Sequence, residues 1–408
     1  MHIRAQATAV TLANMQDSLM QGEKVLTGAR LVLADQVMLG SVRLCDGRIV
    51  DIDAGRMRLP GAIDLEGDHL LPGLVELHTD NHERHAMPRP GVQQPAWSAV
   101  QAHDAEIAAA GITTVFDAIG IGDPYRRGFR GRDQSEMLAV LDALDEAGVL
   151  RADHRLHLRC ELPADNALEL FEPYAGHPRL GLMSLMDHTP GQRQWSDLVR
   201  ARLYFTSKKG WSGQQFDQEI ARPHGPGSER GRRAEANRGA FVALARALGV
   251  ALASHDDTTA AHVDEAHALG ASICEFPTTL EAARRAADLG LLTLGGAPNL
   301  LRGHSHAGNV PVAALVEAGV LDALSSDYVP ATLLAAAWTL ARCSLAQPAD
   351  AARLPQAIAK VSRAPARAVG LHDRGEIAPG LRADLVRVRE VAGQPVVLGV
   401  WRGGRRVA

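Results

Sequence analysis

The chain has few of the residues and runs that mark several classes of protein. Its four cysteines are widely spaced and form no CxxC pair: Cys45, Cys160, Cys274 and Cys343. This spacing argues against a disulfide framework and a structural thiolate zinc site, and it favours a reducing compartment. No run reaches the roughly 18 apolar residues that a membrane span needs, and the opening "MHIRAQATAVTLANMQDSLMQGEK" lacks the apolar core of a signal peptide. We therefore expect a cytoplasmic protein that has no membrane partner.

A strong excess of charge of one sign is also missing. The formal net charge is -4, and charged residues make up 22% of the 408 residues. Without a basic excess we expect no nucleic-acid partner and no polybasic membrane contact. Any anionic ligand must then be held by a local group of cations.

The middle of the chain alternates short strand-like runs with Ala- and Leu-rich helical segments, such as Ser98–Gly111 and Ser135–Gly148. This alternation predicts βα units and a parallel sheet. There are eight candidate strands, the number that a TIM barrel needs. They lie near Gly73–His78, Gly111–Ala118, Arg155–Leu162, Leu180–Asp187, Val250–His255, Ser272–Phe276, Leu291–Gly295 and Ala323–Asp327.

Both ends of the chain have a different pattern, in which β-branched runs alternate with Gly and Asp turns. Residues 24–70 and 376–408 therefore predict one small β-sandwich module built from both termini. The barrel is expected over 71–375, and residues 1–23 form an N-terminal extension. A long insertion between His188 and Phe241 is either functional or disordered, as connections of that length usually are.

Metal-ligand residue types recur at the ends of the expected strands. His78 and Asp80 are two residues apart, so in a strand both side chains point to one face. By itself this pair is a weak signal, and an ordinary hydrogen-bonded strand end explains it better than a metal site does. Further candidates end four other strands, at the face where barrel enzymes keep their sites: Glu161, His188, His255 and Asp327. Together the set predicts two divalent ions that share a carboxylate.

The segments "PGLVELHTD", "GITTV", "SHDD" and "SSDYVP" resemble motifs of the amidohydrolase superfamily. The resemblance implies a (β/α)8 barrel with a split β module and a binuclear metal centre. Asp327 would be both a ligand and the catalytic base. The usual motif is His-x-His with a bridging lysine carbamate, whereas this chain has His78-x-Asp80 and offers Glu161 as the bridge, one strand early. We expect Zn²⁺, and the hard oxygen of Asp80 leaves Mn²⁺ and Fe²⁺ open.

Within the superfamily, "HTDNHERHAMPRPGV", "HLRCEL", "MDHTPGQRQ" and "GAPNLLRGHSHAGN" resemble the diphosphatases of the carbon–phosphorus lyase pathway of phosphonate degradation. This resemblance implies a small-molecule substrate, a phosphorylated sugar phosphonate cleaved at its 5-triphosphate to the 5-phosphate and pyrophosphate. Such a substrate has more negative charge than two metal ions neutralise. Cations are therefore expected at the metal face. The candidates are Arg302, His304, Arg193, Lys208, His85 and Arg89; for His85 an ordinary solvated loop position is an equal alternative.

Two other functions remain open from the sequence. An amidohydrolase with the same metal face could open a cyclic amide or deaminate a base. A different class is a non-catalytic, metal-stabilised subunit of a phosphonate-processing assembly. In either case we expect a homo-oligomer, with a dimer as the simplest form.

Overall fold

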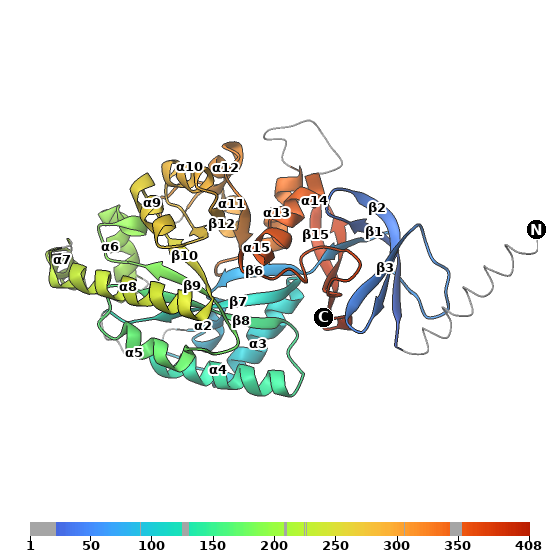
Figure 1. Ribbon diagram of the computed structural model, residues 1–408, viewed down its shortest axis with the longest axis horizontal. Coiled ribbons are helices and arrows are strands. Elements are labelled where there is room, and N and C mark those ends of the chain that lie inside the picture. The colour runs from blue at the N-terminus through green and yellow to red at the C-terminus, as the bar shows by residue number, and fades with distance from the viewer. Residues whose placement is uncertain are drawn as a thin grey trace, which may run out of the picture.

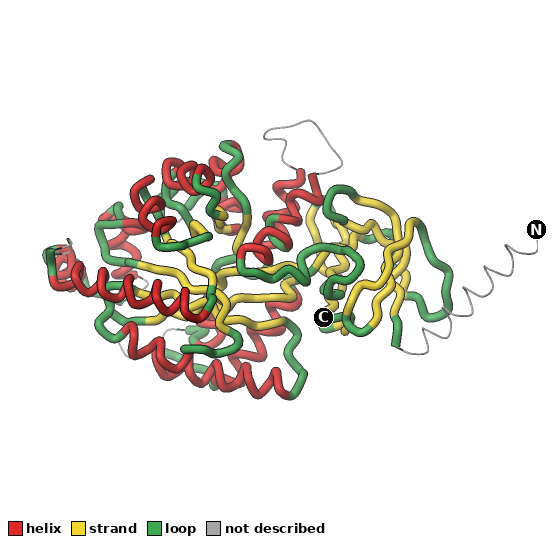
Figure 2. The backbone as a smooth tube through the Cα atoms, in the orientation of Figure 1, coloured by secondary structure: helices red, strands yellow, loops and turns green. Residues whose placement is uncertain are grey.

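The computed structural model describes residues 22–89, 91–124, 130–207, 210–223, 225, 227–305, 307–342 and 353–408, with the side chains of 130–134 left aside. The described chain has two parts side by side, a sheet wrapped by helices and a smaller sheet that contains strands from early and late in the described sequence (Figures 1 and 2). Within these residues no helix has the length and apolar character needed to cross a bilayer.

Eight parallel strands form the larger sheet in chain order from β6 to β13. A parallel bridge between Thr79 and Asp327 links the last strand back to the first, and Ser325 Oγ donates to the carbonyl of His78 at 2.6 Å. The sheet therefore closes into the (β/α)8 barrel, and all eight predicted strands are confirmed. They are β6 (Leu74–Thr79), β7 (Ile112–Ile121), β8 (Asp153–Glu161), β9 (Leu180–Met186), β10 (Ala251–His255), β11 (Ile273–Glu275), β12 (Leu292–Gly296) and β13 (Ala323–Ser325).

Helices follow the strands and cover the outside of the barrel (Figure 1). The two predicted helices are present as α3 and α4, and left-handed glycines follow both, Gly111 and Gly148. The wall consists of α3 (Ala96–Ala109), α4 (Arg130–Glu146), α5 (Ala167–Phe171), α8 (Glu229–Leu248), α9 (Ala260–Ala268), α10 (Leu280–Asp288), α11 (Ala297–Arg302), α12 (Val312–Glu317), α13 (Thr332–Arg342), α14 (Arg353–Ala359) and α15 (Arg363–Ala368).

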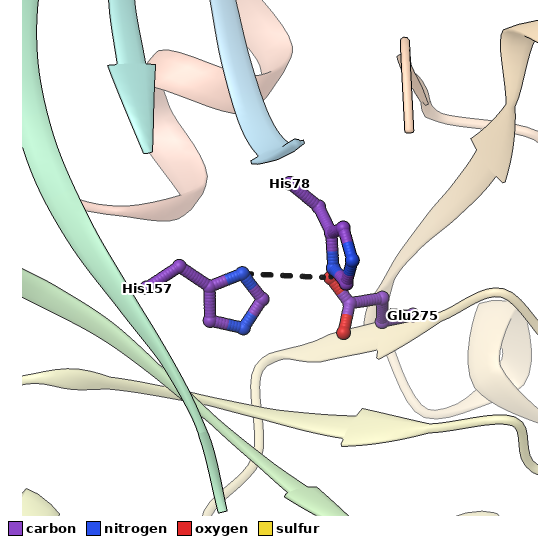
Figure 3. Close-up of side chains that lie close together, drawn as sticks. All are labelled: His78, His157 and Glu275. Carbon is purple, nitrogen blue, oxygen red and sulfur yellow. Dashed lines mark hydrogen bonds and ion pairs between the residues drawn. The ribbon is translucent and has the colours of Figure 1, made fainter. Parts of the chain in front are cut away.

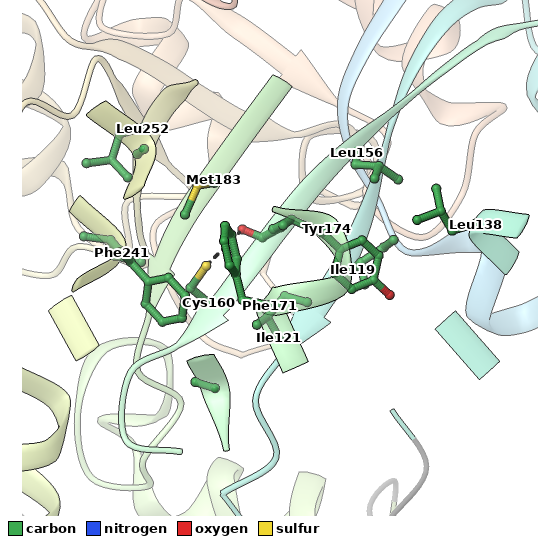
Figure 4. Close-up of a cluster of buried hydrophobic side chains, with 14 of the residues drawn as sticks. Ile119, Ile121, Leu138, Leu156, Cys160, Phe171, Tyr174, Met183, Phe241 and Leu252 are labelled. Atoms are coloured by element: carbon green, nitrogen blue, oxygen red, sulfur yellow. Dashed lines mark hydrogen bonds between the residues drawn. The ribbon is translucent and has the colours of Figure 1, made fainter. Parts of the chain in front are cut away.

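The outer faces of the strands pack against these helices in dry clusters. In Figure 4, side chains of β7, β8 and β9, among them Ile121, Cys160 and Met183, meet Phe171 of α5 and Phe241 of α8. Cys160 is fully buried here, as a packing role requires. Because the outward side chains fill this layer, the inward side chains at the strand ends are left to build the site.

The insertion between β9 and β10 is folded rather than irregular. It contains a 3₁₀ turn at Arg193–Trp195, α6 (Leu198–Ser207) and α7 (Gly213–Ile220) before α8 begins. Its own small aromatic core joins Trp195, Phe205 and Phe216 to Ala307, which lies in the loop after α11. The insertion is therefore packed against a loop beside the open end of the barrel.

The smaller sheet pairs strands from both ends of the chain, in the order β16-β15-β14-β5-β1-β2-β3 with β4 beside β1. The sheet reaches Pro72, which pairs with Leu385, two residues beyond the predicted end of the first module segment at residue 70. The exact domain limits remain a prediction, and the extension before residue 22 lies outside the described residues. The strands are β1 (Lys24–Val32), β2 (Val37–Cys45), β3 (Arg48–Ala54), β4 (Ile63–Asp64), β5 (His69–Pro72), β14 (Leu385–Val391), β15 (Gln394–Arg402) and β16 (Arg405–Arg406).

Candidate metal centre

Three residues within two positions of the ends of barrel strands adopt the left-handed backbone conformation that non-glycine residues rarely occupy. They are Asp256 after β10, Phe276 after β11 and Asp327 after β13, each with φ near +55° (55°, 54° and 55°). Such positions cost about 1–3 kcal/mol each and persist where the surroundings hold them, often at functional sites. The carboxyl ends of these strands are therefore shaped for something other than stability.

Glu275, the last residue of β11, is fully buried between two of the predicted ligands. His78 Nδ1 donates to its Oε1 at 2.7 Å, and His255 Nδ1 donates to its Oε2 at 2.6 Å. With Nδ1 protonated in both rings, Nε2 is left as the nitrogen able to bind an ion. Glu275 thus fixes the tautomer of two imidazoles at once.

Figure 3 shows the third neighbour of this carboxylate, His157 of β8. Its Nδ1 lies 3.9 Å from Glu275 Oε1, 3.0 Å from the carbonyl of Leu77, and its Nε2 is 2.9 Å from Ser184 Oγ. Burial lowers the pKa of His157 to about 3, so the ring is neutral and hydrogen-bonded at both nitrogens. His157 therefore packs beside Glu275 as a neutral ring, and neither of its nitrogens is free to bind an ion.

Glu161, at the end of β8, orients His188 as Glu275 orients His78 and His255. Its two oxygens accept from the backbone N–H of His188 at 2.9 Å and from His188 Nδ1 at 2.7 Å. In this position the carboxylate orients an imidazole. The predicted role of Glu161 as a bridging ligand stays a prediction.

The strongest sign of a cation is at Asp256. Its Oδ2 is buried and has no hydrogen-bond partner among the described residues, yet it lies 3.3 Å from His255 Nε2 and 3.8 Å from His188 Nε2. Two ring nitrogens with lone pairs and a carboxylate oxygen, all within 4.8 Å of one another, repel unless a positive charge lies between them. Nitrogen and oxygen donors of this kind suit a divalent transition metal, so the residues fit the expected ion.

Further carboxylates concentrate negative charge here. Burial, reinforced by Asp80, raises the pKa of Asp327 well above its usual range, and burial raises the pKa of Asp256 to about 6. For Glu275 burial acts in the same direction, but the imidazole of His78 and the hydrogen bond from His255 outweigh burial and hold the Glu275 pKa well below normal. The acidic groups can all be ionised together only if cations share the cavity.

An open cavity lies over these groups. Four of the six predicted ligands line it: His78, His188, His255 and Asp327. Asp80 and Glu161 do not. Asp80 is at the N-cap position of α2 (Asn81–Ala86), where its side chain makes no capping hydrogen bond, and its Oδ2 lies 3.8 Å from Nη1 of Arg159, a residue that does line the cavity. These ligand assignments stay predictions.

Of the six residues predicted to contact phosphate, two line the cavity in the described part of the chain. Arg302 and His304 line the cavity side by side, with 3.2 Å between Arg302 Nη2 and His304 Nε2. Arg193 donates instead to the carbonyl of His255 and to Asp257, at 3.1 and 2.8 Å. His85, bonded to Glu106 at 2.7 Å, and Arg89, in a short β-bridge to Val92, are not among the lining residues. Lys208 lies outside the described residues.

Two residues at the centre of the site, Glu275 and Asp256, were missed by reasoning from the sequence. Glu275 was detectable, because it is an acidic residue at the end of a predicted strand, as Glu161 is. Asp256 follows the end of β10 by one residue, where strand alternation predicts an outward side chain, and the left-handed turn reverses that expectation.

A second buried cluster joins α3 to β7 and β8, and its residues are not among those that line the cavity. His154 Nδ1 donates to Asp117 at 2.8 Å, its Nε2 lies 3.3 Å from Asp104, and His103 Nε2 donates to Asp117 at 2.7 Å. Burial opposes charge on His154, but the two carboxylates outweigh it and raise its pKa to about 9. An imidazolium held between two carboxylates is a structural ion pair, so this cluster braces the barrel wall.

Comparison with known proteins places this site in context. The chain is 44% identical over 386 residues to alpha-D-ribose 1-methylphosphonate 5-triphosphate diphosphatase of Escherichia coli (strain K12), covering 94% of this chain and 100% of the relative. The amidohydrolase family profile matches residues 224–408.

Two solved structures share the architecture. A 5-methylcytosine deaminase from Klebsiella pneumoniae, liganded with phosphonocytosine, superposes with a TM-score of 0.62 at 17% identity, covering 94% of this chain and 98% of the deaminase. An N-acetyl-D-glucosamine-6-phosphate deacetylase from Mycobacterium smegmatis gives 0.59 at 15% identity, covering 94% and 99%. At these identities the likeness concerns the fold alone.

Proposed function

This chain belongs to the amidohydrolase family, and on that premise we propose that it hydrolyses alpha-D-ribose 1-methylphosphonate 5-triphosphate to the 5-phosphate and pyrophosphate in phosphonate catabolism. The observation that carries the proposal is 44% identity to a diphosphatase over that relative's whole length. The site is compatible with this reaction, because its cavity is lined both by metal-ligand residues and by Arg302 and His304.

Two divalent ions would be held by the side chains that meet at the strand ends. His188, His255 and Asp256 form one group of donors, and His78 with Asp327 offers a second. Ions bound there would supply an acidified water at neutral pH and would offset charge on phosphate oxygens. We propose Zn²⁺ as the native metal, with Mn²⁺ or Fe²⁺ able to replace it because carboxylate oxygens are abundant in the donor set.

The chain's own residues supply the remaining steps. Water oxygen bonds to the phosphorus nearest the ribose, and the bond from that phosphorus to the oxygen of the second phosphate breaks. Asp327 takes the proton of the attacking water at its carboxylate, which lies at the cavity wall. Arg302 and His304 bind the outer phosphates and offset the charge that pyrophosphate carries as it leaves.

Product analysis by phosphorus NMR tests this proposal. The purified protein, reconstituted with Zn²⁺, should convert the triphosphate to equal amounts of 5-phosphate and pyrophosphate, and chelator-treated protein should not. Turnover of a cyclic amide or release of ammonia from a base, without pyrophosphate, would favour the other amidohydrolase chemistries. A metal-loaded protein with no turnover of any of these compounds would favour a non-catalytic subunit. The expected homodimer also remains a prediction, which the mass in solution would test.

A further inference from the structure

One arginine in the cavity has no part in the mechanism above. Arg159, on β8, lines the cavity with its side chain 16% exposed. Its Nε donates to the sulfur of Met186 at 3.3 Å, and a thioether is a weak acceptor. Within the described part of the chain neither terminal nitrogen donates a hydrogen bond. The guanidinium therefore presents both of its terminal amino groups to the cavity.

A buried arginine with a purely structural role looks different in the same molecule. Arg374, whose side chain is 4% exposed, donates from Nη1 to Asp153 at 2.6 Å and to Thr114 at 2.8 Å, and from Nε to Asp373 at 2.8 Å. Its hydrogen-bonding capacity is used by fixed partners. Arg159 has only the 3.8 Å approach of Asp80 to its Nη1 as a counter-ion contact, which is too long for a hydrogen bond.

The charges around Arg159 also support a role in binding phosphate oxygens. Its guanidinium interacts electrostatically with carboxylates of the metal centre, Asp80, Glu275 and Asp327. Among the described residues that line the cavity, Arg159 and Arg302 are the two arginines. Arg302 is paired with His304 at the exposed edge, so Arg159 is the cation beside the reacting centre. A planar fork of N–H donors matches two oxygens of one phosphoryl group.

We propose that Arg159 is a catalytic residue whose terminal amino groups donate to the nonbridging oxygens of the phosphoryl group that water attacks. This inference rests on the proposed diphosphatase function. Negative charge on those oxygens would be met by donors already in place, which is the most effective form of transition-state stabilisation. Arg302 would then bind the outer phosphates in both the ground state and the transition state, and the two arginines differ in kinetic role.

Kinetics of Arg159→Met and Arg159→Lys in the metal-loaded full chain test the proposal. Arg159→Met should retain its metal content and lose about 100-fold or more in kcat, the usual effect of removing one transition-state donor. Arg159→Lys should recover part of the loss, and added guanidinium should partly rescue Arg159→Met. The matched control is Arg155→Met, on the same strand near its other end and paired with Asp153, which should keep wild-type kcat.

The outcomes distinguish failure of the proposed role of Arg159 from failure of the proposed diphosphatase function. A wild-type protein that releases pyrophosphate, together with an Arg159→Met variant within about twofold of wild-type kcat, overturns the inference alone. Loss of metal in Arg159→Met, with no rescue by guanidinium, also overturns it and makes Arg159 a counter-ion of Asp80. A wild-type protein that never cleaves the triphosphate removes the proposed function and this inference with it.

Discussion

Replacement of Glu275 by glutamine tests whether this carboxylate sets the tautomer of the two histidines beside it. The carboxylate accepts one hydrogen bond from His78 Nδ1 and one from His255 Nδ1. A glutamine amide has one acceptor oxygen, so it can satisfy only one of these rings. The other ring must accept from the amide N–H, which moves its own proton to Nε2, and a protonated Nε2 cannot bind an ion.

The magnitude follows from losing one nitrogen ligand and weakening another. Removing a hydrogen-bond partner of a metal-binding histidine usually lowers metal affinity 10- to 100-fold, or about 1.4–2.8 kcal/mol. Because Glu275 holds two imidazoles, we expect Glu275→Gln near the upper end of that range. Turnover should fall with metal occupancy, and excess metal should restore only part of it.

Competition with a chelator of known zinc affinity measures the effect directly, with bound metal counted by elemental analysis. Asp142→Asn is the matched control, since Asp142 also binds a histidine, His177 at 3.1 Å, but on the outside of the barrel. Suppose that Glu275→Gln keeps wild-type zinc affinity and that circular dichroism shows an intact fold. Glu275 would then not set the tautomers of His78 and His255, and it would have no role in metal binding.

Three further predictions concern other parts of the molecule. Arg302→Ala should raise KM for the triphosphate several-fold while metal content stays unchanged, because a charge-assisted phosphate contact is lost; steady-state kinetics with unchanged KM would place the phosphates elsewhere. Asp327→Asn should fold normally, as judged by thermal denaturation, and lose most turnover; an active variant would exclude Asp327 as proton acceptor. His154→Gln should lower the free energy of unfolding by about 3 kcal/mol at pH 6, the usual result of breaking a buried ion pair. Since the pKa of His154 is raised from 6.5 to about 9, its stabilising effect is complete below pH 6.5 and disappears as the pH rises through 9. Urea denaturation should therefore show wild type and His154→Gln converging by pH 10, and an equal gap at both pH values would contradict the ion pair.

The barrel could be predicted from the sequence because its signals are local. Each strand is a short apolar run bounded by glycine or a polar residue, and the helices between the strands end at glycines such as Gly111 and Gly148. The split β module followed from similar patterns at both ends of the chain. The insertion was harder to predict, because its charged composition concealed a small aromatic core around Phe205.

The site was only partly predictable, because hydrogen-bond partners across a barrel have no signal in sequence spacing. Which histidines line the cavity follows from strand ends, and His78, His188 and His255 do lie there. That Glu275 joins two of them, or that Glu161 turns toward His188, depends on neighbouring strands in three dimensions. The inward position of Asp256 depends on a left-handed residue, which strand alternation cannot foresee.

Hydrolysis of alpha-D-ribose 1-methylphosphonate 5-triphosphate in ¹⁸O-labelled water, followed by phosphorus NMR and mass spectrometry, tests the central proposal most directly. Attack on the phosphorus nearest the ribose, with Asp327 as proton acceptor and pyrophosphate as leaving group, predicts one labelled oxygen in the ribose 5-phosphate group and none in pyrophosphate. Label in pyrophosphate, or release of labelled orthophosphate, would contradict the proposed line of attack and the binding of the outer phosphates by Arg302 and His304.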